Sequence, residues 1–344
     1  MINRSIQTKI EKTVLMKKYV SIFNKNKNNN IFKDIFIMYV NDIDEKLQKI
    51  KDNKTKKGSK KIYNNNDFFY YSFINFMENG QSWRSMNNIC SYSTYYRKFK
   101  LWTVNNVFIN IYKIFIFYLK NNKILKYADL KNTFIDSSNI RNKQGIDCIE
   151  RNYADKGKNA TKISVITSKS GIPLSSLLVP CNIHDVKTVI KTIKNSYISL
   201  NKSKLGGDKG YISKALTNEL NKNYDIKLIT CERKKRRTKN KIIYDKKNKV
   251  KHSDKPNNKK NTKFLKQRII IENMFAWIKN NKRLQLRYDK YCKNYKSFVN
   301  LAFIKLVINR FSNQYFINNN IKCSIMNQRL FRIYRNKILK NRCV

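Results

Sequence analysis

The spacing of hydrophobic residues predicts that the chain starts with helices and then changes to strands. Between Asp67 and Lys126, apolar residues, many of them aromatic, recur every three or four positions, as on the buried face of a helix. Gly80 interrupts the pattern and marks a boundary between helices. The most apolar stretch, Leu101–Leu119, includes three asparagines and a lysine, so we predict a packed helix rather than a membrane span.

From about residue 130 to residue 231, short β-branched and apolar runs replace the helical spacing. The first of them ends in a carboxylate, Asp136, and a later pair is joined by the turn residues Gly171-Ile-Pro173. The predicted elements are strand Thr133–Ser138, hairpin strands Thr161–Thr167 and Leu174–Val179, helix His184–Leu200, strand Leu205–Asp208, helix Ile212–Tyr224 and strand Ile226–Cys231. This succession predicts a mixed α/β sheet.

The stretch Arg268–Lys279 has the pattern of an amphipathic helix that carries charge beside its buried face. At about 100° per residue, Arg268, Glu272 and Lys279 fall within roughly 40° of one another. An Arg–Glu pair four residues apart commonly does no more than support a helix. A second apolar helix is predicted around Ser297–Phe311.

These patterns and the local composition divide the chain into four parts. We predict a basic, loosely ordered N-terminal segment (1–62), a helical region (63–128), an α/β domain (129–312) and a basic C-terminal tail (313–344). Within the α/β domain, residues 233–263 contain fifteen basic and two acidic residues. Such a density of charge does not bury a core, so we predict a flexible insertion.

The excess of basic residues indicates a nucleic-acid partner. The 344 residues include 74 basic and 22 acidic ones, a formal net charge of +52, which favours binding to nucleic acid. In the helical region, Arg84, Arg97, Lys98 and Lys100 are predicted to be exposed and able to follow a phosphate backbone. Lysine outnumbers arginine 58 to 16 and asparagine runs are frequent, so AT-rich coding drift is an alternative source of the charge.

Cysteine and histidine limit the chemistry. The seven cysteines form no CxxC pair, which argues against a zinc ribbon or a disulfide framework and favours a reducing intracellular compartment. Because nucleic acid is the expected partner, that compartment should have access to DNA. No apolar signal core follows the first residues. The chain has only two histidines, which argues against a His-based metal site and against a Ser-His-Asp triad. Any metal would need oxygen ligands, which favours Mg²⁺ or Mn²⁺.

Asp136, Asp208 and Glu272 each end or adjoin an apolar element and have small or basic neighbours. They are 72 and 64 residues apart, so only a tertiary fold could bring them together. Three converging carboxylates could bind two divalent cations, which would act on the attacking and leaving oxygens at a phosphorus atom. Alternatively, Asp136 and Asp208 cap turns, which is the commoner role of a lone aspartate.

The three acids lie in sequence blocks that resemble a known family. Phe134-Ile-Asp136-Ser-Ser, Gly207-Asp208-Lys-Gly-Tyr211 and Arg268-x3-Glu272-x6-Lys279 are similar to the signature blocks of DDE transposases. More narrowly, the chain resembles the bacterial insertion-sequence group five, in the superfamily with the R-x3-E-x6-K signature. Supporting blocks include Lys158–Val165, His184-Asp185 and Arg287–Lys290, and the resemblance covers about residues 66–311. Leu265 stands where the family often has tyrosine.

The resemblance implies an RNase H-like catalytic domain, preceded by a helical DNA-binding region. Asp136, Asp208 and Glu272 would be the catalytic residues and the ligands of two Mg²⁺ (or Mn²⁺) ions. The candidate DNA contacts are Arg268, Lys279, Lys209, Arg287, Lys290, Arg84 and Arg97. The implied partners are the inverted-repeat ends of a transposon, target DNA and a second copy of the chain, with no membrane.

Two other functions fit the same residues. The chain could be a catalytically silent or repurposed DNA-binding protein derived from a transposase, although all three acids are present. It could also be an RNase H-like nuclease without strand transfer, which would need neither the helical region nor Lys279. Cleavage at inverted repeats that flank the gene would distinguish the transposase from both.

Overall fold

The computed structural model describes residues 31–52, 66–86, 90–230 and 259–311. The chain divides into two compact units, residues 39–304 and residues 1–38 with 305–344. In the described part of the second unit, the rings of Phe32 and Phe311 lie 6.3 Å apart between centroids. All of the predicted site residues belong to the larger unit. The four-part division proposed from composition stays a prediction.

The helices and strands, with 3₁₀ helices written η, occur along the chain in one order. They are α2 Ile31–Asp52, α3 Asn66–Asn79, η1 Trp83–Ser85, α4 Tyr92–Val104, α5 Val107–Asn121, α6 Tyr127–Lys131, β1 Asn132–Asn142, β2 Glu150–Asn152, η2 Tyr153–Asp155, β3 Lys158–Ser168, β4 Pro173–Pro180, α7 Asp185–Lys194, β5 Lys204–Gly207, η3 Lys209–Tyr211, α8 Lys214–Tyr224, β6 Lys227–Thr230, α10 Lys259–Lys266, α11 Ile269–Lys279, α12 Lys282–Gln285, β7 Leu286–Arg287 and α13 Cys292–Phe311.

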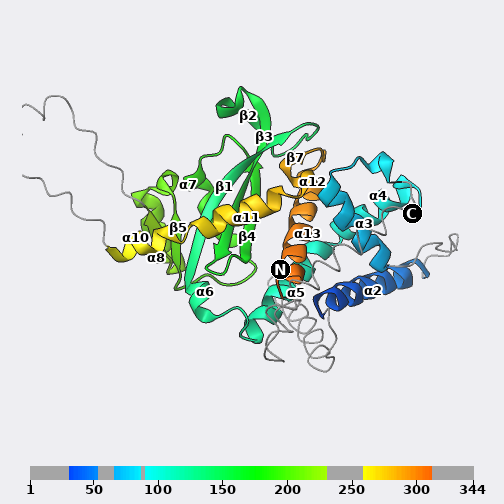
Figure 1. The fold of residues 1–344 in the computed structure, drawn as a ribbon, viewed down its shortest axis with the longest axis horizontal. Helices are drawn as coiled ribbons and strands as arrows, with labels where there is room; N and C mark the ends of the chain where they lie inside the picture. Colours follow the sequence, from blue (N-terminus) through cyan, green and yellow to red (C-terminus); the bar gives the residue numbers. More distant parts are fainter. Residues whose placement is uncertain (1–30, 53–65, 87–89, 231–258, 312–344) are drawn as a thin grey trace, which may run out of the picture. The chain divides into compact units, whose positions relative to one another are not determined.

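The described strands form one mixed sheet, in the order β2-β3-β1-β5-β6, with β4 also paired to β3 and β7 to β1 (Figure 1). β3 is antiparallel to β1 and to β4, whereas β5 is parallel to both β1 and β6. The predicted mixed α/β architecture is therefore confirmed. It is consistent with the RNase H-like fold that the resemblance implied.

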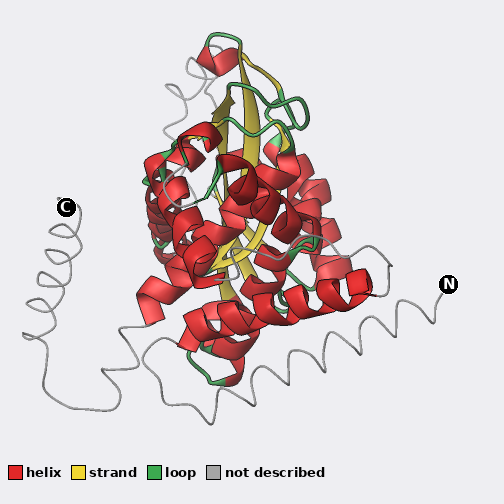
Figure 2. Ribbon diagram, turned by 90° about the vertical axis from the view of Figure 1, so that its right-hand side faces the viewer, coloured by secondary structure: helices red, strands yellow, loops and turns green. Residues whose placement is uncertain are grey.

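The centre of the sheet is buried on both faces. Every residue of β3 from Ala160 to Ser168 is buried, and the strands lie between helices when the molecule is turned (Figure 2). A strand covered on both faces needs no alternation of apolar and polar residues, which explains the continuous run Ile163-Ser-Val-Ile166. Gly171, with φ of 79°, supports the turn of the β3–β4 hairpin, as predicted.

The helical region is packed through aromatic rings. Phe73 lies 5.3 Å from both Phe99 and Trp102 between ring centroids, and all three side chains are completely buried. The stretch Leu101–Leu119 is not one helix, because the chain turns at Asn106, whose φ is 54°. Asparagine tolerates this left-handed conformation, so α4 ends and α5 begins there.

Arg283, which the sequence did not single out, joins the helical region to the sheet. Its side chain is buried, and its guanidinium lies over the rings of Phe76 and Trp83, at 4.6 and 5.9 Å from their centroids. It donates to the carbonyl oxygen of Gln81 at 2.9 Å and to the carboxylate of Asp289 at 3.1 Å. A buried cation needs such partners, so Arg283 fixes how α12 packs against α3 and η1.

Some predicted boundaries differ from the structure, and some short elements were not predicted. The helix that was expected to reach Leu200 ends at Lys194, because Ser196 and Tyr197 turn to donate hydrogen bonds to the carbonyl oxygen of Leu174 in β4. Residues 259–263, assigned to the flexible insertion, begin α10, while 233–258 lie outside the described residues. Strands β2 and β7 and helix α12 were not predicted, since segments of two to four residues carry too little periodicity.

Within the described ranges, no helix combines the length and the apolar composition that a membrane crossing needs. Cys90, Cys148, Cys181 and Cys292 are free thiols there. The other three cysteines lie outside the described residues.

Candidate active site

Two of the three candidate acids lie at the same level of two neighbouring strands, Asp136 within β1 and Asp208 directly after β5. β1 and β5 are parallel neighbours in which Phe134 is paired with Gly206. Asp136 and Asp208 each follow two residues later, so the register of the strands places them side by side. The sequence predicted that the strand ends at Asp136, but the structure differs. β1 continues to Asn142 and pairs with β3 beyond the acid.

Asp208 and Glu272 are held by local structure on either side of β1. Asp208 caps η3, and its Oδ1 accepts a hydrogen bond from the backbone N–H of Gly210 at 2.8 Å. Glu272 lies in the first turn of α11 with half of its side chain exposed, and α11 crosses β1 (Figure 1). Asp208 therefore does have the turn-capping role of an ordinary aspartate, but at a position next to a second acid.

Arg268 connects two of the acids. Its Nη1 donates to Oδ2 of Asp136 at 2.9 Å, and its Nη2 donates to Oε1 of Glu272 at 2.6 Å. The helix pair expected from the spacing of Arg268 and Glu272 is thus present, and it also reaches β1. A single guanidinium holds α11 against the strand that carries Asp136.

The charges of the other two acids affect the pKa of Asp136. Burial raises the pKa of its carboxyl group, a hydrogen bond from the Ser137 N–H and the charge of Arg268 lower it, and the charges of Asp208 and Glu272 raise it. Mutual repulsion of this kind between carboxylates is common at functional sites. The fold therefore brings Asp136, Asp208 and Glu272 into one electrostatic neighbourhood.

The donor set fits a hard divalent cation in its chemistry. All three side chains offer oxygen only, and a cation would offset the repulsion that raises the pKa of Asp136. Over the described residues, no three histidine, cysteine, aspartate or glutamate side chains are gathered closely enough to hold a metal ion. Arg268 supplies positive charge between Asp136 and Glu272 in this conformation.

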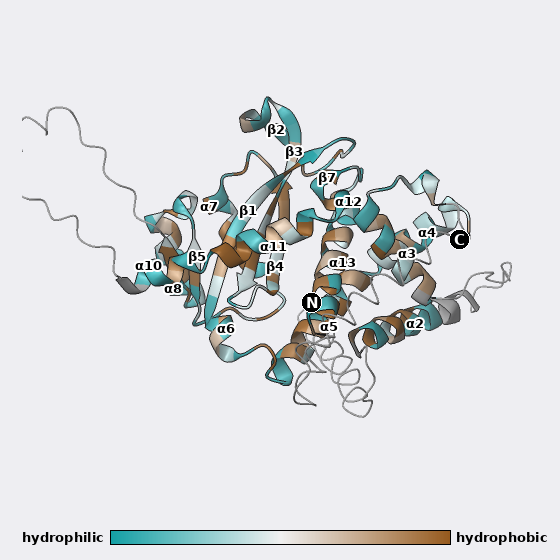
Figure 3. Ribbon diagram, in the orientation of Figure 1, coloured by the Kyte–Doolittle hydropathy of each residue, from teal (hydrophilic) through white to brown (hydrophobic). Residues whose placement is uncertain are grey.

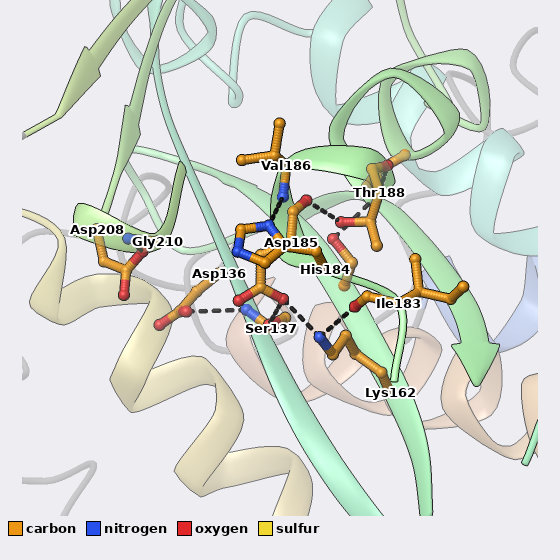
Figure 4. A network of polar contacts seen from close by, with 12 residues as sticks. Asp136, Ser137, Lys162, Ile183, His184, Asp185, Val186, Thr188, Asp208 and Gly210 are labelled. Carbon is orange, nitrogen blue, oxygen red and sulfur yellow. Dashed lines mark hydrogen bonds and ion pairs between the residues drawn. The ribbon is translucent and has the colours of Figure 1, made fainter. Parts of the chain in front are cut away.

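A fourth carboxylate, Asp185, lies beside this group and belongs to a network that joins three elements (Figure 4). Its Oδ1 accepts hydrogen bonds from the Ser137 hydroxyl and from Lys162 Nζ, each at 2.8 Å. Lys162 also donates to the carbonyl oxygen of Ile183 at 2.6 Å. The sequence singled out His184-Asp185 only as a block that opens a helix, and nothing local in it indicated these partners.

The structure exposes the predicted DNA contacts to different degrees. Arg84, Arg97, Lys209 and Lys290 are exposed, and Lys100 is exposed as well. Lys279 is half-buried at the end of α11, about 10 Å along the helix from Glu272. Lys98, expected to be exposed, is instead mostly buried and pairs with Asp44 at 2.7 Å.

The prediction that Arg287 contacts DNA needs the clearest correction, because this residue is fully buried. Its guanidinium donates to the Asp147 carboxylate, to the Thr161 hydroxyl and to three backbone carbonyl oxygens, those of Asp147, Asp289 and Lys290. With its donors committed inside the protein, Arg287 cannot contact a DNA phosphate without local unfolding. Its position in a family-like block therefore marks a structural residue.

With the sheet and the acids in place, comparison with protein families gives a match over residues 128–308, more than half of the chain, to the transposase DDE domain. The chain belongs to this family. Among curated proteins, the search finds no match.

The family match begins at α6, runs through the whole sheet and ends within α13, so all three acids lie inside it. The protein is thus a DDE-type transposase by family. Within the matched region, α10 is mostly hydrophilic, whereas α11 begins with the three isoleucines that directly precede Glu272 (Figure 3). The narrower insertion-sequence group and its signature stay a prediction.

Proposed function

We propose that this transposase binds the ends of a transposon, cleaves a phosphodiester bond there by metal-dependent hydrolysis and joins the resulting 3′-OH end to target DNA. The register of β1 and β5 is the observation that carries the proposal, because Asp136 in β1 and Asp208 directly after β5 each lie two residues beyond the paired Phe134 and Gly206. Arg268 brings Glu272 to the same place from α11. Family membership gives this arrangement its reaction class.

In the proposed mechanism, Asp136, Asp208 and Glu272 would be the catalytic carboxylates and would hold two Mg²⁺ or Mn²⁺ ions. Such ions, when bound, stabilise the attacking and leaving oxygens of an in-line displacement at phosphorus. The protein's own part is to fix the carboxylates. Asp136 is oriented on both sides, by the N–H of Ser137 and by Arg268, and Asp208 is oriented by Gly210.

Arg268 would have two successive roles. Without DNA it pairs with both Asp136 and Glu272, and these ion pairs offset part of the repulsion between the two acids. When DNA arrives, a phosphate would compete for the same guanidinium, since arginine recognises phosphates and carboxylates with the same planar donors. Lys279, further along α11, would contact the same DNA.

The remaining contacts would position the DNA around this site. Lys209 follows Asp208 directly and is exposed, so it would meet the backbone next to the cleaved bond. Arg84 and Arg97 would make contacts from the helical region, and Lys290 from the loop before α13. Both transposon ends must be handled together, so we propose a homodimer.

The test is a cleavage assay with duplex DNA that carries the inverted repeats flanking the gene. With Mg²⁺, the parent protein should cut at the repeat ends, and Asp208→Asn should cut about a thousandfold more slowly, because it loses a metal-binding charge. Denaturing gels with end-labelled strands measure both the position and the rate of the cut.

Asp225→Asn is the matched control. Asp225 is an exposed aspartate of the same domain in a left-handed conformation (φ 52°) that asparagine adopts readily, so this variant should cleave like the parent. Equal cleavage by the parent and Asp208→Asn would reject the catalytic assignment. Specific binding without any cleavage would instead indicate a silent, DNA-binding relative.

A further inference from the structure

We propose that Asp185 is a positioning residue for the catalytic acid Asp136 and acts through Ser137. The inference rests on the proposed function, because it concerns the same reaction. Asp185 would touch neither metal nor DNA, and its task would be to fix the backbone from which the Asp136 carboxylate projects. Lys162 would in turn hold Asp185.

The contacts form a continuous chain from α7 to the acid (Figure 4). Lys162 Nζ donates to Asp185 Oδ1 at 2.8 Å, and the Ser137 hydroxyl donates to the same oxygen at 2.8 Å. The backbone N–H of Ser137 donates to Asp136 Oδ1, also at 2.8 Å. Ser137 therefore faces both carboxylates, one with its side chain and one with its backbone.

Asp185 is not needed as the cap of its own helix. His184 is the N-cap of α7, and its Nδ1 accepts from the N–H of Val186 at 3.3 Å. The Asp185 carboxylate is thereby left to reach across to β1 and β3. A negative charge in the first turn of α7 also interacts favourably with the helix dipole.

The same carboxylate also lies beside the second acid. A Cβ on Gly210 would be 3.0 Å from Asp208 Oδ1 and 3.6 Å from Asp185 Oδ2. A side chain there would crowd the Asp208 carboxylate, whereas the Asp185 oxygen lies at ordinary van der Waals distance. Asp185 is thus placed between the elements that carry Asp136 and Asp208.

A purely structural explanation competes with this one. Lys162 is buried, with 8% of its surface exposed, and a buried lysine needs a negative partner whether or not the site is active. Under that explanation, Asp185 only neutralises Lys162, and the hydrogen bond from Ser137 has no consequence for cleavage. The two explanations predict different outcomes for the variants below.

The test compares four variants of the full chain in single-turnover cleavage of the inverted-repeat duplex with Mg²⁺. Ser137→Ala and Asp185→Ala should cleave about 10- to 100-fold more slowly, the usual range when a group that orients a ligand is removed. The double variant Asp185→Asn/Lys162→Gln should stay within about threefold of the parent, because the amide oxygen still accepts from Ser137 and no charge is left unpaired. Lys162→Gln alone should chiefly lower the melting temperature.

Two further readouts separate positioning from loss of folding. DNA affinity, measured by fluorescence anisotropy with Ca²⁺ in place of Mg²⁺, should change by less than about twofold in every variant, as expected of a group that affects only the chemical step. Hydrogen exchange of the peptide that contains the Ser137 amide should accelerate about fivefold or more in Asp185→Ala. Thr188→Val is the control, since the Thr188 hydroxyl donates only to the backbone oxygen of Asp185, at 2.7 Å.

Parental cleavage by Ser137→Ala or Asp185→Ala would overturn the proposal. So would a double variant as slow as Asp185→Ala, because the carboxylate itself would then be required. If the parent protein does not cleave DNA at all, the proposed function is rejected, but the positioning role of Asp185 is not yet rejected. Hydrogen exchange at Ser137 still decides the positioning claim in that case, and an unchanged rate in Asp185→Ala rejects it.

Discussion

Two arginines of this domain show how one residue type takes opposite roles. Arg268 is a quarter exposed and divides its donors between Asp136 and Glu272, so a phosphate can compete for them. Arg287 is completely buried and donates to five acceptors inside the protein. Both belong to blocks that resemble the family, and only burial distinguishes the candidate DNA contact from the structural residue.

Arg287→Met should therefore destabilise the protein without acting on DNA directly. The substitution leaves the Asp147 carboxylate, the Thr161 hydroxyl and three carbonyl oxygens without their donor, and we expect the free energy of unfolding to fall by about 3–5 kcal/mol. Urea unfolding measures it. Lys290→Met, an exposed position three residues away, should change stability by less than about 0.5 kcal/mol.

One result for Arg287→Met would contradict this structural role. A variant that unfolds at the parental urea concentration but binds DNA more weakly would restore Arg287 as a DNA contact.

Lys296 gives a pH-dependent prediction at the same scale. Burial lowers the pKa of its ammonium group from 10.5 to about 7, and its Nζ contacts the hydroxyl and the carbonyl oxygen of Ser176. Between pH 7 and 10.5 the unfolded chain therefore binds more protons at this position than the folded protein, so its contribution to stability rises with pH. Lys296→Met should raise the melting temperature at about pH 7, and the gain should shrink at about pH 9.

Comparison with Lys293→Met, at an exposed position on the same helix, removes the contribution of other titrating groups. An equal gain at both pH values would mean that Lys296 is not desolvated.

At the scale of elements, a close approach of α10 to the sheet decides where the predicted insertion ends. The ring of Phe264 in α10 stacks on Phe134 in β1, with 5.0 Å between centroids. Gly206 of β5 lies beside them, and a Cβ there would be 2.8 Å from the Phe134 ring and 2.9 Å from the Phe264 ring. Phe134 lies two residues before Asp136 and Gly206 two residues before Asp208, so α10 packs on β1, which carries Asp136, and on β5, which directly precedes Asp208.

Gly206→Ala should force the two rings apart. Overpacking of this kind costs about 1–3 kcal/mol of stability, which urea unfolding would detect. Hydrogen exchange over residues 259–266 should also accelerate, since α10 would pack less closely on the sheet. Lys204→Ala, at an exposed position on the same strand, should change neither quantity, and unchanged exchange in Gly206→Ala would show that α10 is held by other residues.

At the scale of the whole molecule, the net charge of +52 should appear in how DNA affinity depends on salt. Residues 233–256, which lie outside the described residues, carry twelve basic and two acidic side chains. Replacing this segment by a Gly/Ser linker of equal length should weaken DNA binding for all sequences. The slope of log Kd against log salt should fall by about 0.9 for each phosphate that the segment neutralises in the parent complex.

The preference of this linker variant for transposon ends should persist. A version of equal length with glutamine in place of each lysine and arginine controls for composition, and it should behave like the linker. Loss of end preference in either protein would mean that the segment recognises sequence rather than charge.

The sequence by itself determined the strands of the β3–β4 hairpin and the α11 helix, and it singled out the three acids as candidates. The physical reason is that these features depend on neighbours: a β-branched run, a helical repeat and a turn glycine act within a few residues. It also determined the mixed α/β class, because the order of elements along the chain restricts the possible sheets.

Only the tertiary structure decided what the charged residues contact. Arg268 meets Asp136 across 132 residues of sequence, and Asp185 meets Ser137 across 48. The same holds for the burial of Arg287, and for Asp136, which lies within β1 because β3 continues to pair beyond it. Desolvation and ion pairing depend on atoms that are brought together by the fold, so no local pattern could have shown which arginine contacts the acids and which one belongs to the core.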